Sequence, residues 1–387
     1  MKLQDKKVAI IGGGPGGLTL ARLLQQKGVN VNVYERDYDK NARVQGSPLD
    51  LHQDSGLAAI IKADLLEEFK ANFMLGADKT KIMNDKGDVV FDEDHKPIET
   101  NFDDPYFRPE IDRGQLRKIL LASLKEETVH WNKHYISMDK HNDGWLLNFK
   151  DDLSVYADIV IGADGANSKI RPYITDTKAI YSGVTMIEGT IYDAEKHSPI
   201  IYKKLNGGKI MAFGNKKNIL IGQKGNGEIG FYLSLKVDES WIKNSNLNFS
   251  NKTEILNWFR EEYKEWDKSW EELVENTTES FIPRSIGYMP LNQNWETISN
   301  LTVIGDAAHV MPPFAGEGVN MAMLDALELS EKLTAIDAIS VKDAISNYES
   351  EMRKRAAIIT KESIENGEKM HNENSLEIML QFFTEHK

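Results

Sequence analysis

Hydrophobic and polar residues near the start of the chain follow the pattern of a strand, a helix and a second strand. Residues 8–11 are continuously apolar, which is typical of a buried strand. After a glycine-rich stretch, leucine and alanine recur with helical spacing over residues 18–24, and Gly28 is placed to end that helix. Apolar and polar residues then alternate over 29–33. The pattern predicts a β–α–β unit.

The remainder of the chain carries less regular patterns. Between residues 180 and 240, short apolar stretches are separated by glycines, which predicts an antiparallel sheet inserted between parts of an α/β domain. Elsewhere apolar runs predict strands and helical spacing predicts helices, one of them rich in tryptophan. The strands are expected at 129–136, 145–149, 158–161 and 301–304, and the helices at 111–126, 252–274, 317–334 and 341–369.

Composition and charge narrow the classes of protein to consider. The chain has 387 residues, enough for two or three domains at about 150 residues each. Hydrophobic residues make up 41% and there are 28 glycines, which is ordinary for a globular protein. Acidic residues outnumber basic ones, 60 to 47, and the basic residues form no stripe. We therefore expect neither nucleic-acid binding nor attachment to anionic membranes.

Missing residue types and missing patterns limit the chemistry and the location. The chain has no cysteine, which excludes disulfides, thiolate metal sites, cysteine nucleophiles and iron–sulfur clusters. It has no P-loop, H-E-x-x-H or G-x-S-x-G motif. His130 and His134 are four residues apart, but they lie in a predicted strand and need not share a face, so no metal site is expected. The start of the chain lacks a signal-peptide pattern, and no apolar stretch approaches ~18 residues. We therefore expect a cytoplasmic protein without a membrane span.

The glycine-rich stretch after the first strand has the spacing of a dinucleotide-binding turn. In G-x-G-x-x-G, Gly12 makes the tight turn, Gly14 lets a pyrophosphate approach the backbone, and Gly17 lets the helix pack against the strand. The start of the helix offers unpaired N–H groups to phosphate. Glu35 ends the second strand, where a carboxylate accepts hydrogen bonds from ribose hydroxyls. The stretch predicts a bound dinucleotide but does not separate NAD(P) from FAD.

Two later segments separate these cofactors. Residues 162–171, GADGANSKIR, and residues 305–320, GDAAHVMPPFAGEGVN, each follow a predicted strand. Either one alone is typical of an ordinary turn between a strand and a helix. In this order after the N-terminal motif, they resemble the class A flavoprotein monooxygenases, the aromatic-hydroxylase-like group. The stretches VAIIGGGPGGLTLARLLQQKG, VYERD, LDLH and DR-x-x-LR-x-ILL are similar to those of the tetracycline-inactivating flavin monooxygenases, the tetracycline destructases.

The resemblance covers the whole chain and implies its fold. The implied class is α/β, with a Rossmann-like FAD-binding domain of the GR2 or aromatic-hydroxylase type, an inserted antiparallel β-sheet substrate domain and a long C-terminal helix. The implied boundaries are 1–70, 104–177 and 281–335 for the discontinuous FAD-binding domain, 71–103 and 178–280 for the substrate-binding domain, and 341–387 for a C-terminal bridging helix and tail.

The resemblance also implies the activity. It points to a monomeric monooxygenase that uses NADPH as co-substrate to reduce non-covalently bound FAD. Oxygen from O2 would then reach an organic small-molecule substrate, with tetracycline-like polycyclic compounds among the candidates, through a C4a-hydroperoxyflavin. No catalytic side chain is expected, because the flavin carries the chemistry.

Matched residue by residue, the resemblance implies a set of cofactor contacts. Glu35 and Arg36 lie at the adenosine end, Asp50 and Leu51 approach the isoalloxazine, and Asp306 binds the ribityl or pyrophosphate part. The full set for FAD is Gly12, Gly14, Pro15, Gly17, Glu35, Arg36, Asp50, Leu51, Arg113, Asp164, Asp306, Pro313, Gly316, Gly318, Val319 and Asn320, and Arg43 matches a position that contacts NADPH.

Physical arguments support the assignment of the segment near Gly318 but give an alternative interpretation of Arg113. The helix that begins near Gly318 offers N–H groups and a dipole that stabilise negative charge on a reduced flavin. Arg113, taken from the residues alone, is a surface arginine paired with Glu110 or Asp112, and the resemblance turns it into a cofactor contact. His309 lies inside a motif but is expected to be buried and hydrogen-bonded rather than reactive.

The resemblance weakens on the substrate side. The destructases hold the drug with polar side chains of their antiparallel sheet. At the matching positions Glu188 replaces Gln, Lys209 replaces Arg, Gly230 replaces His and Ile221 replaces Phe, whereas Met211 is retained. Lysine does not reproduce the bidentate fork of arginine, and Glu188 repels an anionic drug unless Lys209 neutralises it. We therefore expect a flavin-facing substrate site with a weak hold on tetracyclines.

Other patterns have simpler interpretations. Residues 225–230 fit G-x-G-x-x-G but lie in the glycine-rich β region, so they predict a hairpin turn and no separate nicotinamide domain. Trp258, Trp266 and Trp270 are expected to pack on one helix. Two functions compete with monooxygenation: an FAD oxidoreductase of the same fold that reduces or desaturates its substrate without oxygen insertion, and a flavoprotein that only sequesters a drug.

Overall fold

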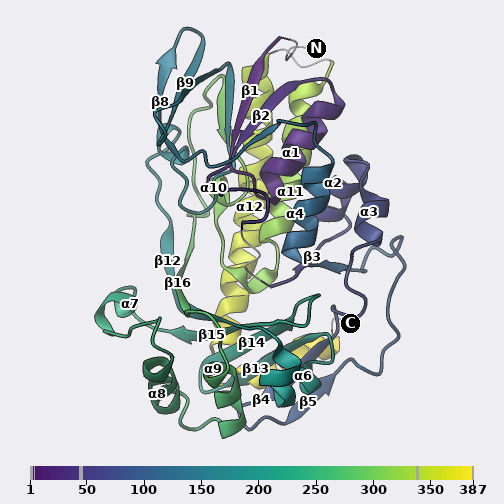
Figure 1. The fold of residues 1–387 in the computed structure, drawn as a ribbon, viewed down its shortest axis with the longest axis vertical. Coiled ribbons are helices and arrows are strands. Elements are labelled where there is room, and N and C mark those ends of the chain that lie inside the picture. The colour runs from purple at the N-terminus through teal and green to yellow at the C-terminus, as the bar shows by residue number, and fades with distance from the viewer. Residues whose placement is uncertain (1–2, 4, 43–46, 337–339, 386–387) are drawn as a thin grey trace.

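The computed structural model describes residues 3, 5–42, 47–336 and 340–385, and its upper part in Figure 1 is built on a parallel sheet. Five strands pair in the order β17–β11–β1–β2–β7, and every pair is parallel. The predicted β–α–β unit is confirmed, with Gly28 following α1 at a φ of 74°. The bounds are Lys7–Ile11 for β1, Pro15–Gln26 for α1, Asn30–Tyr34 for β2, Val129–His130 for β7, Ile159–Gly162 for β11 and Leu301–Val303 for β17.

Helices and a second sheet pack around these five strands. Helices α1 and α11 pack together, and the antiparallel sheet β10–β9–β8 places Trp145 and Leu147 in the same hydrophobic cluster as Ile10 and Ile161. The bounds are Gly56–Lys62 for α2, Leu66–Lys70 for α3, Arg113–Ala122 for α4, Tyr135–His141 for β8, Gly144–Phe149 for β9, Ser154–Ala157 for β10, Asp306–His309 for α10 and Gly318–Thr334 for α11.

The lower part of Figure 1 is a seven-stranded sheet in the order β16–β12–β15–β14–β13–β4–β5. Its pairs are antiparallel except β13 with β4, so the inserted sheet is mixed rather than purely antiparallel. The bounds are Thr80–Asn84 for β4, Val89–Asp92 for β5, Ile180–Ile191 for β12, Lys209–Gly214 for β13, Lys217–Gln223 for β14, Ile229–Lys236 for β15 and Ile282–Tyr288 for β16.

The two faces of this sheet differ in character, because neighbouring residues of a strand point to opposite faces. The face that we call the packed face contacts α6, α8 and α9 through a hydrophobic cluster that includes Ile187, Ile210, Ile219, Ile221, Phe231 and Leu233. The opposite face, which we call the inner face, carries Glu188, Lys209, Met211, Tyr232 and Arg284 by the strand registers. The helices are α5 (Ala194–His197), α6 (Pro199–Leu205), α7 (Trp241–Asn244), α8 (Lys252–Glu262) and α9 (Glu271–Glu275).

The predicted helix at 252–274 is wrong, because the chain breaks into two helices. Asp267 caps a short 3-10 helix, η2 (Lys268–Trp270), by accepting from the N–H of Ser269, and its own N–H donates to the carbonyl of Asp85. The local cap and the long-range bond to Asp85 replace helical hydrogen bonds at this point. The tryptophans therefore do not share one helix, but packing is confirmed: Trp266 and Trp270 are buried in the hydrophobic cluster of the packed face, and Trp258 packs against it.

Other boundaries also differ from the prediction. The strand expected at 129–136 is two strands, since β7 joins the parallel sheet and β8 joins the three-stranded sheet. β16 pairs with β12, so the seven-stranded sheet extends past the boundary expected at residue 281. The hairpin expected at 225–230 is confirmed as the turn between β14 and β15.

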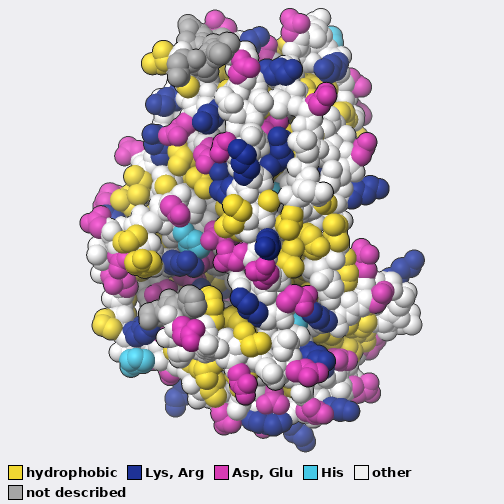
Figure 2. Space-filling model, turned by 180° about the vertical axis from the view of Figure 1, so that it is seen from behind, with side chains coloured by type: hydrophobic (Ala, Val, Ile, Leu, Met, Phe, Trp, Pro, Cys, Tyr) yellow, Lys and Arg dark blue, Asp and Glu magenta, His cyan; other side chains and the backbone are white. Residues whose placement is uncertain are grey.

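The C-terminal helix α12 (Val341–Met370) runs from the upper part of the molecule to the lower one (Figure 1). Beyond it the expected tail forms a further helix, α13 (Ser375–Glu385), which contacts β4 and β13. Acidic and basic side chains are interspersed over the face seen in Figure 2. Among the helices of the described residues, none is long and apolar enough to cross a membrane.

Candidate functional site

The glycine turn between β1 and α1 combines one crowded position with one open position. Gly12 has a φ of 112°, and a Cβ there would lie 2.2 Å from the carbonyl oxygen of Ala163, so only glycine fits. A Cβ on Gly14 would meet nothing within 4 Å. α1 then begins at Pro15, whose missing N–H costs the first turn nothing. The fold therefore requires Gly12, whereas Gly14 leaves its backbone approachable.

Glu35 lies at the end of β2, as expected, and it is buried. Its carboxylate accepts from the N–H of Gly13 at 2.6 Å and from the N–H of Asp37 at 2.8 Å. The side chain thus ties the glycine turn to the neighbouring strand. Arg36 next to it is exposed. Arg43, expected at the NADPH contact, lies outside the described residues.

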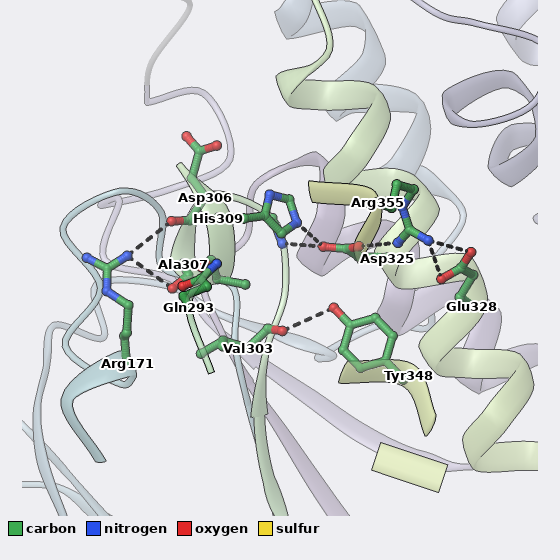
Figure 3. A network of polar contacts seen from close by, with 12 residues as sticks. Arg171, Gln293, Val303, Asp306, Ala307, His309, Asp325, Glu328, Tyr348 and Arg355 are labelled. Atoms are coloured by element: carbon green, nitrogen blue, oxygen red, sulfur yellow. Dashed lines mark hydrogen bonds and ion pairs between the residues drawn. The ribbon is translucent and has the colours of Figure 1, made fainter. Parts of the chain in front are cut away.

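A second turn of the parallel sheet brings Asp164 near the same edge. Its Oδ2 accepts from the N–H of Lys169 at 2.7 Å, while Oδ1 is buried and has no hydrogen-bond partner among the residues that the structure describes. Burial raises the pKa of the Asp164 carboxyl. Arg171, in the 3-10 helix η1 (Arg171–Tyr173), donates from Nη1 to the carbonyls of Asp306 and Ala307 (Figure 3).

The third turn carries Asp306 at the start of α10, next to an ionic network (Figure 3). The Asp306 side chain keeps solvent access, yet the surrounding protein displaces enough water to raise the pKa of its carboxyl. His309 on the same turn is buried, and its Nε2 lies 2.6 Å from Asp325 Oδ2. Arg355 of α12 contacts Asp325 Oδ1 at 2.7 Å and pairs with Glu328. The expectation of a buried, hydrogen-bonded His309 is confirmed.

Two segments far apart in sequence meet where the isoalloxazine contacts were expected. His52 follows β3 (Leu49–Asp50) and is buried, with Nε2 3.1 Å from Asp50 Oδ2 and Nδ1 3.0 Å from Glu317 Oε1. Glu317 is the cap residue before α11. Burial alone would lower the pKa of His52, but the hydrogen bonds with Asp50 and Glu317 raise it to about 9. Burial likewise opposes ionisation of Asp50, but His52 and Lys209 lower its pKa to about 2.

The side chains of two residues expected beside the flavin, Asn320 and Leu51, make contacts inside the protein. The Asn320 side chain is buried, accepts from the N–H of His52 at 3.0 Å and donates to the carbonyl of Asp50 at 3.0 Å. Leu51 is fully buried in a hydrophobic cluster with α2 and α4 residues. Any cofactor contact by Leu51 would have to come from its backbone. Pro313 and Gly316 are exposed, and Val319 is half-buried.

Arg113 does not pair with either carboxylate considered from the residues alone. Its Nε donates to the carbonyl of Ser47 at 2.9 Å, while Asp112 caps α4 and Glu110, at the start of β6 (Glu110–Ile111), forms an ion pair with Lys209. Burial of its surroundings lowers the pKa of Arg113, and the charges that oppose this effect include Asp306 and Glu188. Arg113 therefore lies between the parallel-sheet domain and the inner face.

The inner face carries ion pairs that the sequence did not predict. Arg284 donates from Nε to Glu188 Oε2 at 2.7 Å, with the Glu188 side chain only 6% exposed and the Arg284 side chain 46% exposed. Lys209 pairs with the buried Glu110. The partner of Glu188 is therefore Arg284, and not Lys209 as considered from the sequence. In both pairs the carboxylate is the buried member and the cation is the accessible one.

The other three expected substrate residues, Met211, Ile221 and Gly230, differ from one another in their surroundings. Met211 lies on the inner face, packed against Met370 and Met379 of the C-terminal helices. Ile221 is wrong as a substrate residue, because it points into the hydrophobic cluster of the packed face. Gly230 is buried, and a Cβ there would lie 3.6 Å from Lys224 Cε, so the alkyl chain of that lysine covers it.

The positions near the three turns fit a dinucleotide with a flavin. As at Gly14, a Cβ on Gly318 at the start of α11 would meet nothing within 4 Å, so both helix starts present approachable backbone. Arg113 supplies a cation and Asp306 an anion, and each affects the pKa of the other. A separate surface hollow of about 700 Å³ shares none of these residues in its lining. Within the described parts of the chain, no group of three or more His, Asp or Glu side chains is arranged to hold a metal ion.

Sequence reasoning missed several of the charged groups described above. His52 and Glu317 were quoted within motifs, but nothing local shows that they meet, because 265 positions separate them (317 − 52). Arg284 and Asp325 lie outside any recognised motif. Their partners are set by strand register and helix packing, which single-sequence patterns do not resolve.

Comparisons with known proteins agree on the cofactor fold. A family model described as "FAD binding domain" matches residues 5–187 and 293–363, which is more than half of the chain. The monooxygenase asqM of Emericella nidulans is 28% identical, covering 89% of this chain and 88% of that protein. The 3-amino-4-hydroxybenzoate 2-monooxygenase PtmB3 of Streptomyces platensis is 26% identical, covering 94% of this chain and 88% of that protein.

Solved structures confirm the expected fold class. HpxO of Klebsiella pneumoniae, complexed with FAD and uric acid, has a TM-score of 0.76 at 17% identity, covering 99% of this chain and 93% of that one. The tetracycline destructase Tet(55) has a TM-score of 0.76 at 18% identity, covering 99% of this chain and 95% of that one. At these identities the likeness shows the fold alone. The equal scores do not favour the destructase over HpxO.

Proposed function

Because this chain belongs to the FAD binding domain family and is an FAD-dependent monooxygenase, we propose that it oxidises NADPH and hydroxylates an electron-rich organic substrate. The observation that carries the proposal is the pair of approachable helix starts at Gly14 and Gly318, together with the cation of Arg113 and the anion of Asp306, which interact with each other. The inner face of the seven-stranded sheet would hold the substrate.

The residues of the parallel-sheet domain would hold the cofactor. The N–H groups at the start of α1 would bind its pyrophosphate, Arg113 would offset negative charge, and Asp306 would accept hydrogen bonds from its hydroxyls. Bound flavin supplies the electron transfer and oxygen activation that hydroxylation requires. The start of α11, beside Gly318, favours a negative charge on the adjacent group. His52 holds its proton between Asp50 and Glu317, and so offsets part of the negative charge of these two carboxylates beside the start of α11.

The inner face supports a polar, oxygen-rich substrate. Arg284 and Lys209 present accessible cations whose charges are balanced by Glu188 and Glu110. The relative PtmB3 is named for a hydroxybenzoate, and such a phenol has the electron-rich ring that hydroxylation needs. Tetracyclines are expected to be poor substrates, because positions 188, 209 and 230 lack the destructase side chains.

The cofactor assignment is tested by comparing two neighbouring glycines. Gly14→Ala should fold normally, because its methyl group has room, but it should retain FAD about ten- to a hundredfold more weakly. Arg113→Ala and Asp306→Ala should weaken retention to a similar extent. Gly12→Ala is the matched control and should lose thermal stability before anything else, because of its clash and its positive φ. FAD retention by ultrafiltration and melting by circular dichroism give the two readouts. Wild-type retention in all three folded variants would refute the assignment.

The reaction and the substrate are tested together. Enzyme, NADPH and O2 are incubated with hydroxybenzoates and with tetracyclines, and oxygen uptake and product mass are measured. A substrate-dependent gain of one oxygen atom supports monooxygenation, whereas a product with two hydrogens more or fewer supports the alternative FAD oxidoreductase. Efficient turnover of tetracycline at micromolar concentration would contradict the interpretation of positions 188, 209 and 230. Gain of such turnover in Glu188→Gln/Lys209→Arg/Gly230→His would support it.

A further inference from the structure

His309 has a buried nitrogen that neither the fold nor the proposed cofactor contacts use. The residue is 1% exposed, and its Nε2 is held by Asp325. Its Nδ1 is fully buried and has no hydrogen-bond partner among the residues that the structure describes. In Figure 3 this ring edge is turned away from Asp325, toward the side on which Asp306 projects. A buried polar atom without a partner costs free energy, so its orientation calls for a physical reason.

The charges around His309 favour its protonated form. Asp325 accepts from the N–H of Gly305 at 2.8 Å and contacts both His309 and Arg355. Glu328 pairs with the other side of Arg355. With His309 protonated, two cations balance two carboxylates inside this network. With His309 neutral, the network would carry a net negative charge close to the turn that bears Asp306, which is unfavourable for a second carboxylate there.

His309 is one of three positive neighbours of Asp306. The protein around it raises the pKa of its carboxyl, and the charges that oppose this shift are those of His309, Arg113 and Arg171. Burial would lower the pKa of His309, but Asp325 and Asp306 raise it. His309 and Asp306 both lie on α10. The charged and titratable groups that face them are Asp325 and Glu328 of α11, Arg355 and Tyr348 of α12, Arg171 of η1 and Arg113 of α4.

We propose that His309 is a positioning residue for the cofactor: held by Asp325 as an imidazolium, it keeps Asp306 ionised so that this carboxylate accepts hydrogen bonds from cofactor hydroxyls. The inference rests on the proposed role of Asp306 at FAD. It gives Arg355 a part as well, because that side chain of α12 completes the charge balance around Asp325.

The test measures FAD release from the full-length holoprotein as a function of pH. Samples are diluted between pH 5 and pH 9, and released FAD is quantified by its fluorescence. The wild type should lose FAD toward low pH as Asp306 becomes protonated. In His309→Gln this acid limb should move up by roughly one pH unit, because an opposite charge near a carboxyl changes its pKa by about that much. Retention at pH 8 should stay within a few-fold of the wild type.

Companion variants keep the outcome decisive. Arg355→Gln, which removes the other cation of the network, should move the acid limb in the same direction and serves if His309→Gln does not fold. His141→Gln, an exposed histidine, should leave the profile unchanged. Asp306→Asn should bind weakly at every pH, and wild-type binding by this variant would refute the proposed role of Asp306 itself. If Asp306→Asn binds weakly but His309→Gln and Arg355→Gln lose FAD equally at all pH values, only the inference about His309 is overturned.

Discussion

The packed face and the inner face of the seven-stranded sheet are made by alternate residues of the same strands, yet they use opposite chemistry. On β15, Phe231 enters the hydrophobic cluster beneath α8 and α9, and its neighbour Tyr232 faces Arg113 across the inner side. On β12, Ile187 lies in the same cluster, whereas Glu188 pairs with Arg284. One face is a conventional core and the other is a set of paired charges.

The two faces of the seven-stranded sheet therefore contribute to different properties, one to folding stability and the other to substrate binding. Apolar burial on the packed face stabilises the sheet without regard to what binds it. Buried carboxylates on the inner side contribute little net stability, because desolvation offsets their ion pairs. Their arrangement, with the anion buried and the cation accessible, is better explained by substrate binding. We therefore expect substitutions on the packed face to lower mainly stability, and substitutions on the inner face to lower mainly substrate affinity.

The largest effect is expected on the packed face. Phe231→Ala should destabilise the protein by about 3–5 kcal/mol, because it removes a fully buried ring and leaves a cavity. The measurement is urea unfolding of the FAD-loaded protein. Tyr232→Phe is the matched control on the adjacent residue and should change stability by less than about 0.5 kcal/mol. Equal losses for both variants would break the distinction between the faces.

A smaller and pH-dependent effect is expected from His52, which borders the inner face. Its pKa is raised from 6.5 to about 9, so its contribution is fully present below pH 6.5 and is lost as the pH rises through 9. The difference corresponds to roughly 3 kcal/mol at most. The wild type should therefore lose stability between pH 7 and pH 10, and His52→Gln should remove this decline, as urea unfolding at a series of pH values would show. An unchanged slope in this variant would contradict the ion pairs with Asp50 and Glu317.

The smallest effect on stability is expected at the ion pair between Glu188 and Arg284 on the inner face. Arg284→Gln leaves the carboxylate of Glu188 buried without its charged partner, at a cost of roughly 1–3 kcal/mol. The double variant Glu188→Gln/Arg284→Gln should recover most of that loss. Both variants should raise the KM for the substrate while FAD retention stays at the wild-type level. A loss of FAD instead would place the pair at the cofactor.

The sequence predicted the parts of the structure that depend on local pattern. The β–α–β unit and the hairpin at 225–230 were readable because spacing alone determines them. Ile221 was assigned to the wrong face, since a shift of one residue in alignment reverses the face of a strand. The helix at 252–274 was broken by the bond between Asp267 and Asp85, which lie 182 positions apart (267 − 85). The ion pairs of Glu188 and Lys209 depend on the same kind of long-range register.

The long helix α12 has a mechanical consequence. Near its middle, Arg355 is fixed to Asp325 in the parallel-sheet domain, and His371, which follows its last residue, contacts Ser234 of the seven-stranded sheet. A helix of 30 residues is about 45 Å long and resists bending. It therefore works as a stiff spacer that fixes the separation between the cofactor domain and the inner face. We expect substrates to be admitted by rearrangement of loops and side chains rather than by hinge opening of the two domains.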